Sequence, residues 1–135
     1  MGSVVQRVKE LQLPENEYVV IGSGLLDALN LREAHDLDLA VSDQLFDAFA
    51  ASGNFNKLER YGAEVLEGST EVTKDIEVWK QWQDDLPFEV LSSKTVIVDG
   101  VAFAHPETII GRKELRSLEK DLRDIKLLKE HYHYE

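Results

Sequence analysis

Residues 18–42, YVVIGSGLLDALNLREAHDLDLAVS, decide the fold of this 135-residue chain. Two short apolar runs in this stretch flank a glycine-serine turn and a polar connector. The second run alternates acidic and apolar residues, as Asp36-Leu37-Asp38-Leu39. Because strand side chains alternate between the two faces of a sheet, this spacing predicts a strand with both aspartates on one face and both leucines on the other.

The two aspartates form a candidate metal site. Two carboxylates held close together repel each other, and each raises the pKa of the other unless a cation lies between them. Oxygen ligands of this kind suit Mg²⁺, which keeps several waters and also binds substrate phosphates. We therefore expect Asp36 and Asp38 to bind Mg²⁺, or Mn²⁺ in its place.

The turn before the aspartates has the chemistry of a phosphate site. Gly22 and Gly24 allow unusual backbone angles and a close approach of the backbone to a ligand, and Ser23 adds a hydroxyl. The next residues, 25–29, are predicted to start a short helix, whose free N–H groups would bind phosphate. Twelve residues separate Ser23 from Asp36, so a phosphate-binding turn closely precedes the predicted metal ligands.

These two features together resemble the signature of the nucleotidyltransferase superfamily, which has the fold of DNA polymerase beta. The matching residues are Ile21-Gly22-Ser23 and the alternating run 36–39. The flanking stretch 31–49, LREAHDLDLAVSDQLFDAF, is also similar to small stand-alone bacterial members. The resemblance and the strand patterns predict an α/β (α+β) fold with a mixed, largely antiparallel sheet of about five strands, flanked by helices and ending in C-terminal helices.

A third carboxylate is expected on a strand beside the acidic pair, because the superfamily uses one there. The run Asp75-Ile76-Glu77-Val78 has the pattern of such a strand. Glu77 fits best, and Asp75, which has the same parity along the strand, is the alternative. The ordinary structural interpretation is a glutamate that faces solvent on a half-buried strand.

Three basic residues are candidates for phosphate binding through the same resemblance. Arg32 falls where the small relatives often carry an arginine, although it also has the pattern of a surface arginine paired with a neighbouring acid. Lys113 and Lys120 match a family ending in which a lysine precedes a Lys-Asp-x-x-Asp-Ile run, here residues 120–125. The relatives often place an arginine two residues before the second lysine, where this chain has Leu118. A solvated helix face is the alternative for both lysines.

The rest of the chain gives local structural signals. Residues 4–13 have helical spacing, Ser42 or Asp43 caps a further helix, and residues 57–82 have the alternation of paired strands with a turn near 68–69. A short helix is expected at 87–93. Asp99-Gly100 predicts a hairpin between 95–98 and 101–104, and two helices follow from His105 onwards.

Composition limits the functional classes. The net charge is −11, from 15 Lys and Arg against 26 Asp and Glu, so nonspecific nucleic-acid binding is not expected. The chain has no cysteines, which excludes disulfides and thiolate metal sites and is compatible with a reducing compartment. No apolar run approaches the roughly 18–20 residues of a membrane span. We expect a single cytoplasmic domain over residues 1–135.

The resemblance implies Mg²⁺-dependent transfer of a nucleoside monophosphate from an NTP to a small-molecule or macromolecular acceptor hydroxyl. The residues it implicates are Asp36, Asp38 and Glu77 in catalysis and metal binding, and Gly22, Ser23, Gly24, Arg32, Lys113 and Lys120 in phosphate binding. Many active relatives carry a further helical domain, and this chain has almost nothing beyond the expected core. The alternatives are therefore a catalytically degenerate nucleotide- or protein-binding module, toxin-antitoxin-like or a homodimer, and a metal-dependent phosphate-ester hydrolase.

Overall fold

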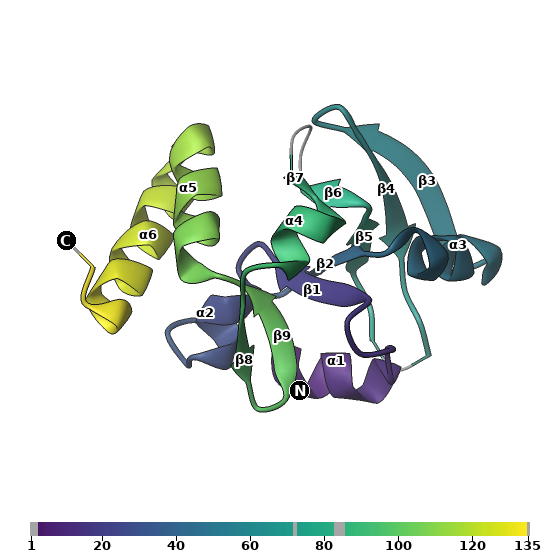
Figure 1. Cartoon of the computed structure of the whole chain (residues 1–135), viewed down its shortest axis with the longest axis horizontal. Helices are drawn as coiled ribbons and strands as arrows, with labels where there is room; N and C mark the ends of the chain where they lie inside the picture. Colours follow the sequence, from purple (N-terminus) through teal and green to yellow (C-terminus); the bar gives the residue numbers. More distant parts are fainter. Residues whose placement is uncertain (1–2, 72, 83–85, 135) are drawn as a thin grey trace.

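The fold is a mixed sheet with helices packed around it, and the computed structural model describes residues 3–71, 73–82 and 86–134 (Figure 1). The helices are α1 (Val4–Leu11), α2 (Gly24–Ala28), α3 (Asp43–Ala51), α4 (Phe88–Ser92), α5 (Pro106–Arg116) and α6 (Glu119–Tyr132). The strands are β1 (Tyr18–Ile21), β2 (Leu37–Val41), β3 (Phe55–Arg60), β4 (Ala63–Gly68), β5 (Ile76–Trp79), β6 (Gln81–Trp82), β7 (Leu86–Pro87), β8 (Thr95–Val98) and β9 (Val101–Ala104).

Within the described residues, the main sheet has seven strands in the order β3-β4-β5-β2-β1-β9-β8. The pairs β1–β9 and β2–β5 are parallel, and the other neighbours are antiparallel. A separate two-stranded sheet pairs β6 with β7. The predicted fold class and the mixed, largely antiparallel sheet are confirmed, whereas the expected number of about five strands is too low.

Part of the difference comes from the hairpin of β3 and β4. The predicted change of direction after Gly68 is confirmed, because β4 ends there and pairs antiparallel with β5, but the chain also turns back earlier, between β3 and β4, at Tyr61 and Gly62. Both residues have positive φ angles, 51° and 74°. Two consecutive left-handed residues form the tight turn that matches the twist of a hairpin. Tyrosine is an unusual residue for this conformation, so the sequence signal is weak.

Stronger local signals are confirmed. Asp99 and Gly100, with φ angles of 51° and 84°, connect β8 and β9 as the predicted hairpin turn. Ser42 is the N-cap of α3, and its hydroxyl accepts a hydrogen bond from the Leu45 N–H at 3.2 Å. The predicted short helix before residue 93 is α4. In each case the signal lies within a few neighbouring residues, where backbone preferences act directly.

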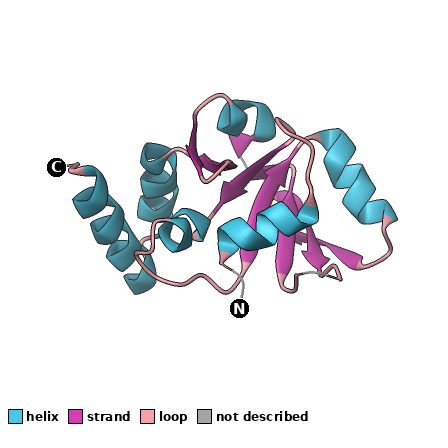
Figure 2. Cartoon of the chain, turned by 90° about the horizontal axis from the view of Figure 1, so that it is seen from below, coloured by secondary structure: helices cyan, strands magenta, loops and turns pink. Residues whose placement is uncertain are grey.

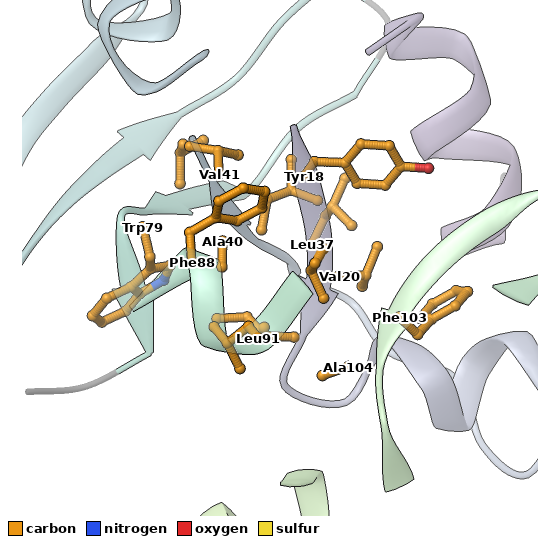
Figure 3. Packing of buried hydrophobic residues seen from close by; sticks show 14 of the residues in the cluster. Tyr18, Val20, Leu37, Ala40, Val41, Trp79, Phe88, Leu91, Phe103 and Ala104 are labelled. Atoms are coloured by element: carbon orange, nitrogen blue, oxygen red, sulfur yellow. The ribbon is translucent and has the colours of Figure 1, made fainter. Parts of the chain in front are cut away.

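The sheet is buried on both faces near its centre. Strand pairing puts Asp38, Ala40, Glu77 and Trp79 on one face of β2 and β5, because directly paired residues point to the same side. Helix α4 packs against β1 and β2 on this face, and Figure 3 shows its side chains beside Ala40. Helices α1 and α2 pack near β1 and β9, on the side of Phe103 (Figure 3). Asp38 is the one residue of β2 that is only partly buried, so its carboxyl is largely removed from water and still borders the surface.

The C-terminal helices α5 and α6 pack against each other at one end of the sheet, next to α2 (Figure 1). Figure 2 shows the same arrangement from below, with the helices around the strands. The apolar residues Ile109, Ile110, Ile125 and Leu128 are buried in this pair. None of the helices that the structure describes is long and apolar enough to span a membrane.

Candidate functional site

A cavity of about 720 Å³ lies where β1 ends and β2 and β5 begin. Its size is within the range of small-molecule sites. Among the described residues that line it, six are basic and four are acidic: Arg32, Arg60, Arg112, Lys113, Arg116 and Lys120, and Asp36, Asp38, Glu77 and Asp124. Basic residues therefore gather around this cavity although the whole chain has a net charge of −11.

The acidic residues of β2 and β5 form one wall. Asp38 is the direct partner of Glu77 across the parallel pair β2–β5, so their side chains point to the same side of the sheet. Asp36 precedes β2, is exposed and also lines the cavity. Asp75, the alternative third carboxylate, has a positive φ of 57° and lines a different cavity. The structure therefore brings Glu77, and not Asp75, to the wall that holds both aspartates.

The Asp38 carboxyl is the titrating group of this wall. Burial raises its pKa most, and the negative charges of Glu77 and Asp36 raise it further, to about 7. The positive charges of Lys113 and Arg116 oppose this shift without cancelling it. A carboxyl in this environment is stabilised by binding a proton or by a cation placed beside it.

A hard divalent cation fits the donor chemistry of this wall, because three carboxylates line it. However, no three His, Cys, Asp or Glu side chains among the described residues converge closely enough to hold a metal ion as they stand. One reason is that the Glu77 carboxylate is already paired: its Oε2 accepts a hydrogen bond from Arg60 Nη1 at 2.7 Å.

Gly22 brings the glycine-serine turn against the acidic wall. Its φ is +70°, and a Cβ added at this position would lie 2.7 Å from Asp38 Oδ2. A side chain here would therefore be strained by the backbone angle and would also collide with the carboxylate. The absence of a side chain lets the turn and the acidic residue meet.

Gly24 has a different role from the one that its place in the turn suggested. It is buried, does not line the cavity and has no positive φ. A Cβ on Gly24 would lie 2.5 Å from Val20 Cγ1 and 3.3 Å from Val4 Cγ1. This glycine lets α2 pack closely on β1 and α1, and phosphate binding by its backbone N–H stays a prediction.

Another part of the cavity lining is a hydrogen-bonded network around the buried Asp124 carboxylate. Arg32 donates to it from Nε at 2.6 Å and from Nη2 at 2.7 Å, and Lys113 Nζ donates at 2.9 Å. The Ser23 hydroxyl donates to Asp124 at 3.2 Å and accepts from Lys113 Nζ at 3.0 Å and from Arg32 Nη2 at 2.8 Å. Three of the predicted phosphate-binding residues, Ser23, Arg32 and Lys113, thus share Asp124 as a partner. The sequence motif at 120–125 includes Asp124, but no role was predicted for it.

Electrostatics keep this network ionised. Burial acts to raise the pKa of Asp124, but the hydrogen bonds from Arg32 and Lys113 lower it to about 2. The Lys113 side chain is only 5% exposed, so the alternative of a solvated helix face is wrong for this lysine, which is buried among charges. Lys120, by contrast, is exposed at the edge of the cavity, and no ion pair involves it within the described residues.

A second buried aspartate, Asp121, lies on the same helix as Asp124 and binds Arg116. Asp121 accepts hydrogen bonds from Arg116 Nε at 2.8 Å and from Nη2 at 2.7 Å. It also accepts one from the Leu118 backbone N–H at 3.1 Å, at the start of α6. The pKa of Asp121 is lowered, chiefly by the bonds from Arg116. Arg116 thus holds the α5–α6 junction and also lines the cavity.

Sequence reasoning missed Arg60, Arg112, Arg116 and Asp124 as site residues. Asp124 and Arg116 are an acid and a base in a charged helical segment, and nothing local distinguishes them from a solvated face. Arg60 lies in β3, none of whose residues is buried. The available signal was the C-terminal motif, in which residues 121 and 124 lie three apart and so on one side of a helix.

Comparison with known proteins adds one structural similarity. No protein-family model matches the sequence, and no curated protein matches it. The structure is similar to the crystal structure of an antigenic nucleotidyltransferase-like protein from Paracoccidioides brasiliensis, with a TM-score of 0.45 and 19% sequence identity. The aligned region covers 93% of this chain and 72% of that chain. The functional conclusion therefore depends on the geometry of the cavity.

Proposed function

We propose that this protein is a Mg²⁺-dependent nucleotidyltransferase, which transfers a nucleoside monophosphate from an NTP to an acceptor hydroxyl. The observation that carries the proposal is the close approach of Gly22 to the Asp38 carboxylate in a cavity that six basic residues also line among the described residues. A glycine-serine turn that comes this close to a metal-binding carboxylate would suit a ligand in which phosphates and a divalent cation are bound together.

The roles of the residues follow from their positions. Asp36, Asp38 and Glu77 would hold Mg²⁺, which would neutralise charge on the phosphoryl oxygens. The backbone at Gly22 and Ser23, with Arg32 and Lys113, would bind the β- and γ-phosphates. Exposed and at the edge of the cavity, Lys120 is suited to the outermost phosphate. Together these groups would hold the triphosphate in one orientation. Positioning and charge stabilisation are the main contributions of a protein to phosphoryl transfer.

The proposed reaction is a displacement at the α-phosphorus. The acceptor oxygen forms a new bond to this phosphorus, the bond to the oxygen that bridges the α- and β-phosphates breaks, and pyrophosphate leaves. Glu77 would accept the proton of the acceptor hydroxyl, because it lies on the cavity wall beside Asp38. The net charge of −11 favours a small or cationic acceptor over a long nucleic acid.

A second candidate is a degenerate nucleotide-binding module without catalysis. The pairing of Glu77 with Arg60 favours it, because the arginine already neutralises a carboxylate that catalysis would need as a metal ligand. The two candidates differ in turnover: the module would bind nucleotide and never release pyrophosphate. A phosphate-ester hydrolase would differ from both by releasing a nucleoside monophosphate to water.

Isothermal titration calorimetry with ATP, GTP, CTP and UTP, with and without Mg²⁺, tests the proposal. We expect Mg²⁺-dependent binding of at least one nucleotide, and its loss in Asp36→Ala/Asp38→Ala. The matched control is Glu15→Ala/Asp47→Ala, which removes two exposed acids that line neither cavity. No binding of any nucleotide, or equal binding by both double variants, would contradict the proposed site.

A further inference from the structure

Arg60 lies beside a row of carboxylates that crosses three neighbouring strands. Asp38 on β2 is paired with Glu77 on β5, and Glu77 is in turn paired with Glu67 on β4. Like charges that are directly opposite each other destabilise a sheet. The Arg60 guanidinium bridges two of them, with Nη1 2.7 Å from Glu77 Oε2 and Nη2 2.6 Å from Glu67 Oε2.

The bridge is located at the wall of the cavity. Arg60 and Glu77 both line it, and Glu67 does not. The side chains of Arg60 and Glu77 are 40% and 23% exposed, so solvent ions reach the pair. The Glu77 carboxylate, which we propose as a metal ligand, is therefore hydrogen-bonded through Oε2 to a protein cation.

We propose that Arg60 is an internal cation that competes with the divalent metal for Glu77, so that metal binding releases the guanidinium into the cavity. The inference rests on the proposed function, because it takes Asp36, Asp38 and Glu77 as the metal ligands. The competition has a simple electrostatic basis: a divalent cation at Glu77 repels a guanidinium bonded to the same carboxylate. The competition is therefore one of repulsion between two cations at a single carboxylate, whose two oxygens offer several acceptor sites.

Release of Arg60 links the affinity for the metal ion to the affinity for the nucleotide. The freed guanidinium is still next to Glu67 and still lines the cavity, where an arginine fork binds phosphate oxygens well. When metal ions bind alone, no ligand anion is present to pair with the displaced Arg60, and so the metal ions bind weakly. Metal ions that arrive with a triphosphate supply an anion for the displaced arginine, and so bind strongly. Arg60 therefore couples the binding of the metal to that of the nucleotide.

Mn²⁺ alone is the first probe, because electron paramagnetic resonance reports the free hydrated ion in the absence of any turnover. Arg60→Gln removes the competing charge, and we expect it to bind Mn²⁺ about tenfold more tightly than wild type does, the equivalent of one charge-assisted hydrogen bond. Lys57→Gln is the matched control: it lies on the same strand, loses the same charge and pairs with Glu64 outside the cavity. We expect this control to bind Mn²⁺ as wild type does.

Mn²⁺·ATP is the second probe, and coupling predicts an effect of opposite sign. Arg60→Gln should bind Mn²⁺·ATP several-fold more weakly than wild type does, since the phosphates lose a partner. A residue that merely neutralises the two glutamates would not move the two affinities in opposite directions. Equal Mn²⁺ affinities of wild type and Arg60→Gln would overturn the inference and leave the proposed function standing, provided that Asp38→Asn abolishes Mn²⁺ binding. An absence of Mn²⁺ binding in all these proteins would overturn both.

Two further variants keep the inference testable if Arg60→Gln does not fold, as checked by circular dichroism. Arg60→Lys keeps the charge but cannot bridge two carboxylates, and its Mn²⁺ affinity should lie between those of wild type and Arg60→Gln. Glu67→Gln frees the guanidinium to pair with Glu77 alone, so Mn²⁺ should bind more weakly than to wild type. Tighter Mn²⁺ binding by Glu67→Gln would contradict the competition.

Discussion

Gly22 shows at the scale of one residue why the site needs a glycine. Its left-handed backbone and its contact with Asp38 are separate requirements, and substitution by alanine violates both. We expect Gly22→Ala to lower the free energy of unfolding by more than the about 1–2 kcal/mol of a left-handed residue. We also expect it to weaken Mg²⁺·NTP binding at least about tenfold, a loss of about 1.4 kcal/mol.

Gly53→Ala is the control for Gly22→Ala. Gly53 also has a positive φ, +82°, but an added Cβ would meet nothing within 4 Å. Urea denaturation should therefore show the backbone penalty alone, and nucleotide titration should give wild-type affinity. If Gly22→Ala behaves like Gly53→Ala in both measurements, the turn does not touch the functional site.

Asp38 gives the second prediction at this scale, through the pH dependence of stability. Its pKa is raised to about 7 in the folded protein from 3.8. Between these values the folded state binds the proton more tightly than the unfolded state does, so the contribution of Asp38 to stability falls as pH rises from about 4 to 7. The full effect is at most about 4 kcal/mol.

Asp38→Asn removes this titration, and we expect it to be more stable than wild type at pH 7.5 in the absence of metal. The difference should shrink toward pH 4, where the wild-type carboxyl is protonated in the folded state. Urea denaturation across this pH range measures it, with Asp47→Asn, at an exposed position that lines neither cavity, as the control. A variant that is less stable than wild type at every pH would show that Asp38 is stabilising as an anion.

At the scale of elements, the Asp124 network joins α6 to three other parts of the chain: the start of α2, the connector before β2, and α5. Ser23, Arg32 and Lys113 each contribute one contact region. Their positions are therefore set by one buried carboxylate on a helix that is itself far away in the sequence. Removing one partner of a buried ion pair leaves the other charges uncompensated, which is strongly destabilising.

Asp124→Asn should lower the free energy of unfolding by about 3–5 kcal/mol, because Arg32 and Lys113 lose their shared anion. Added ATP or inorganic phosphate should recover more thermal stability in this variant than in wild type, since the ligand supplies an anion to the same cations. Asp121→Asn is the comparison variant, because Asp121 is equally buried and accepts its side-chain hydrogen bonds from Arg116, while among the described residues it meets the network through an ion pair with Lys113 at 3.9 Å. If ATP or phosphate stabilises both variants equally, the Asp124 network is not the site at which phosphate binds.

At the scale of the whole molecule, charge is distributed unevenly. The chain has a net charge of −11, and yet six basic residues line the cavity. Binding of long nucleic acid depends on an extended basic surface that releases counterions, and the overall charge opposes it. Fluorescence anisotropy should thus detect no binding of a labelled 20-base-pair DNA duplex at about 50 mM salt, under conditions in which Mg²⁺·NTP binds. Binding of the duplex would extend the proposed acceptors to nucleic acids.

Local patterns were sufficient for the strands and turns whose signals lie within a few residues. The alternation over 36–41 predicted β2 and its acidic face, and Asp99-Gly100 predicted a hairpin. The turn at Tyr61-Gly62 was missed because tyrosine seldom adopts a left-handed backbone. Side-chain direction and turn conformation depend on neighbouring residues in the chain, so they can be predicted from the sequence.

The sequence by itself determined the alternating strand and the glycine that the turn requires, because backbone geometry near each residue follows from its own side chain and its neighbours. The fold class was predicted from such patterns together with the resemblance to a known superfamily. Only the tertiary structure decided which charges meet. Ser23 and Asp124 are 101 positions apart, and Arg60 and Glu77 are 17 apart. Such pairs depend on strand order and helix packing, and these are set by burial of the whole core rather than by any local pattern.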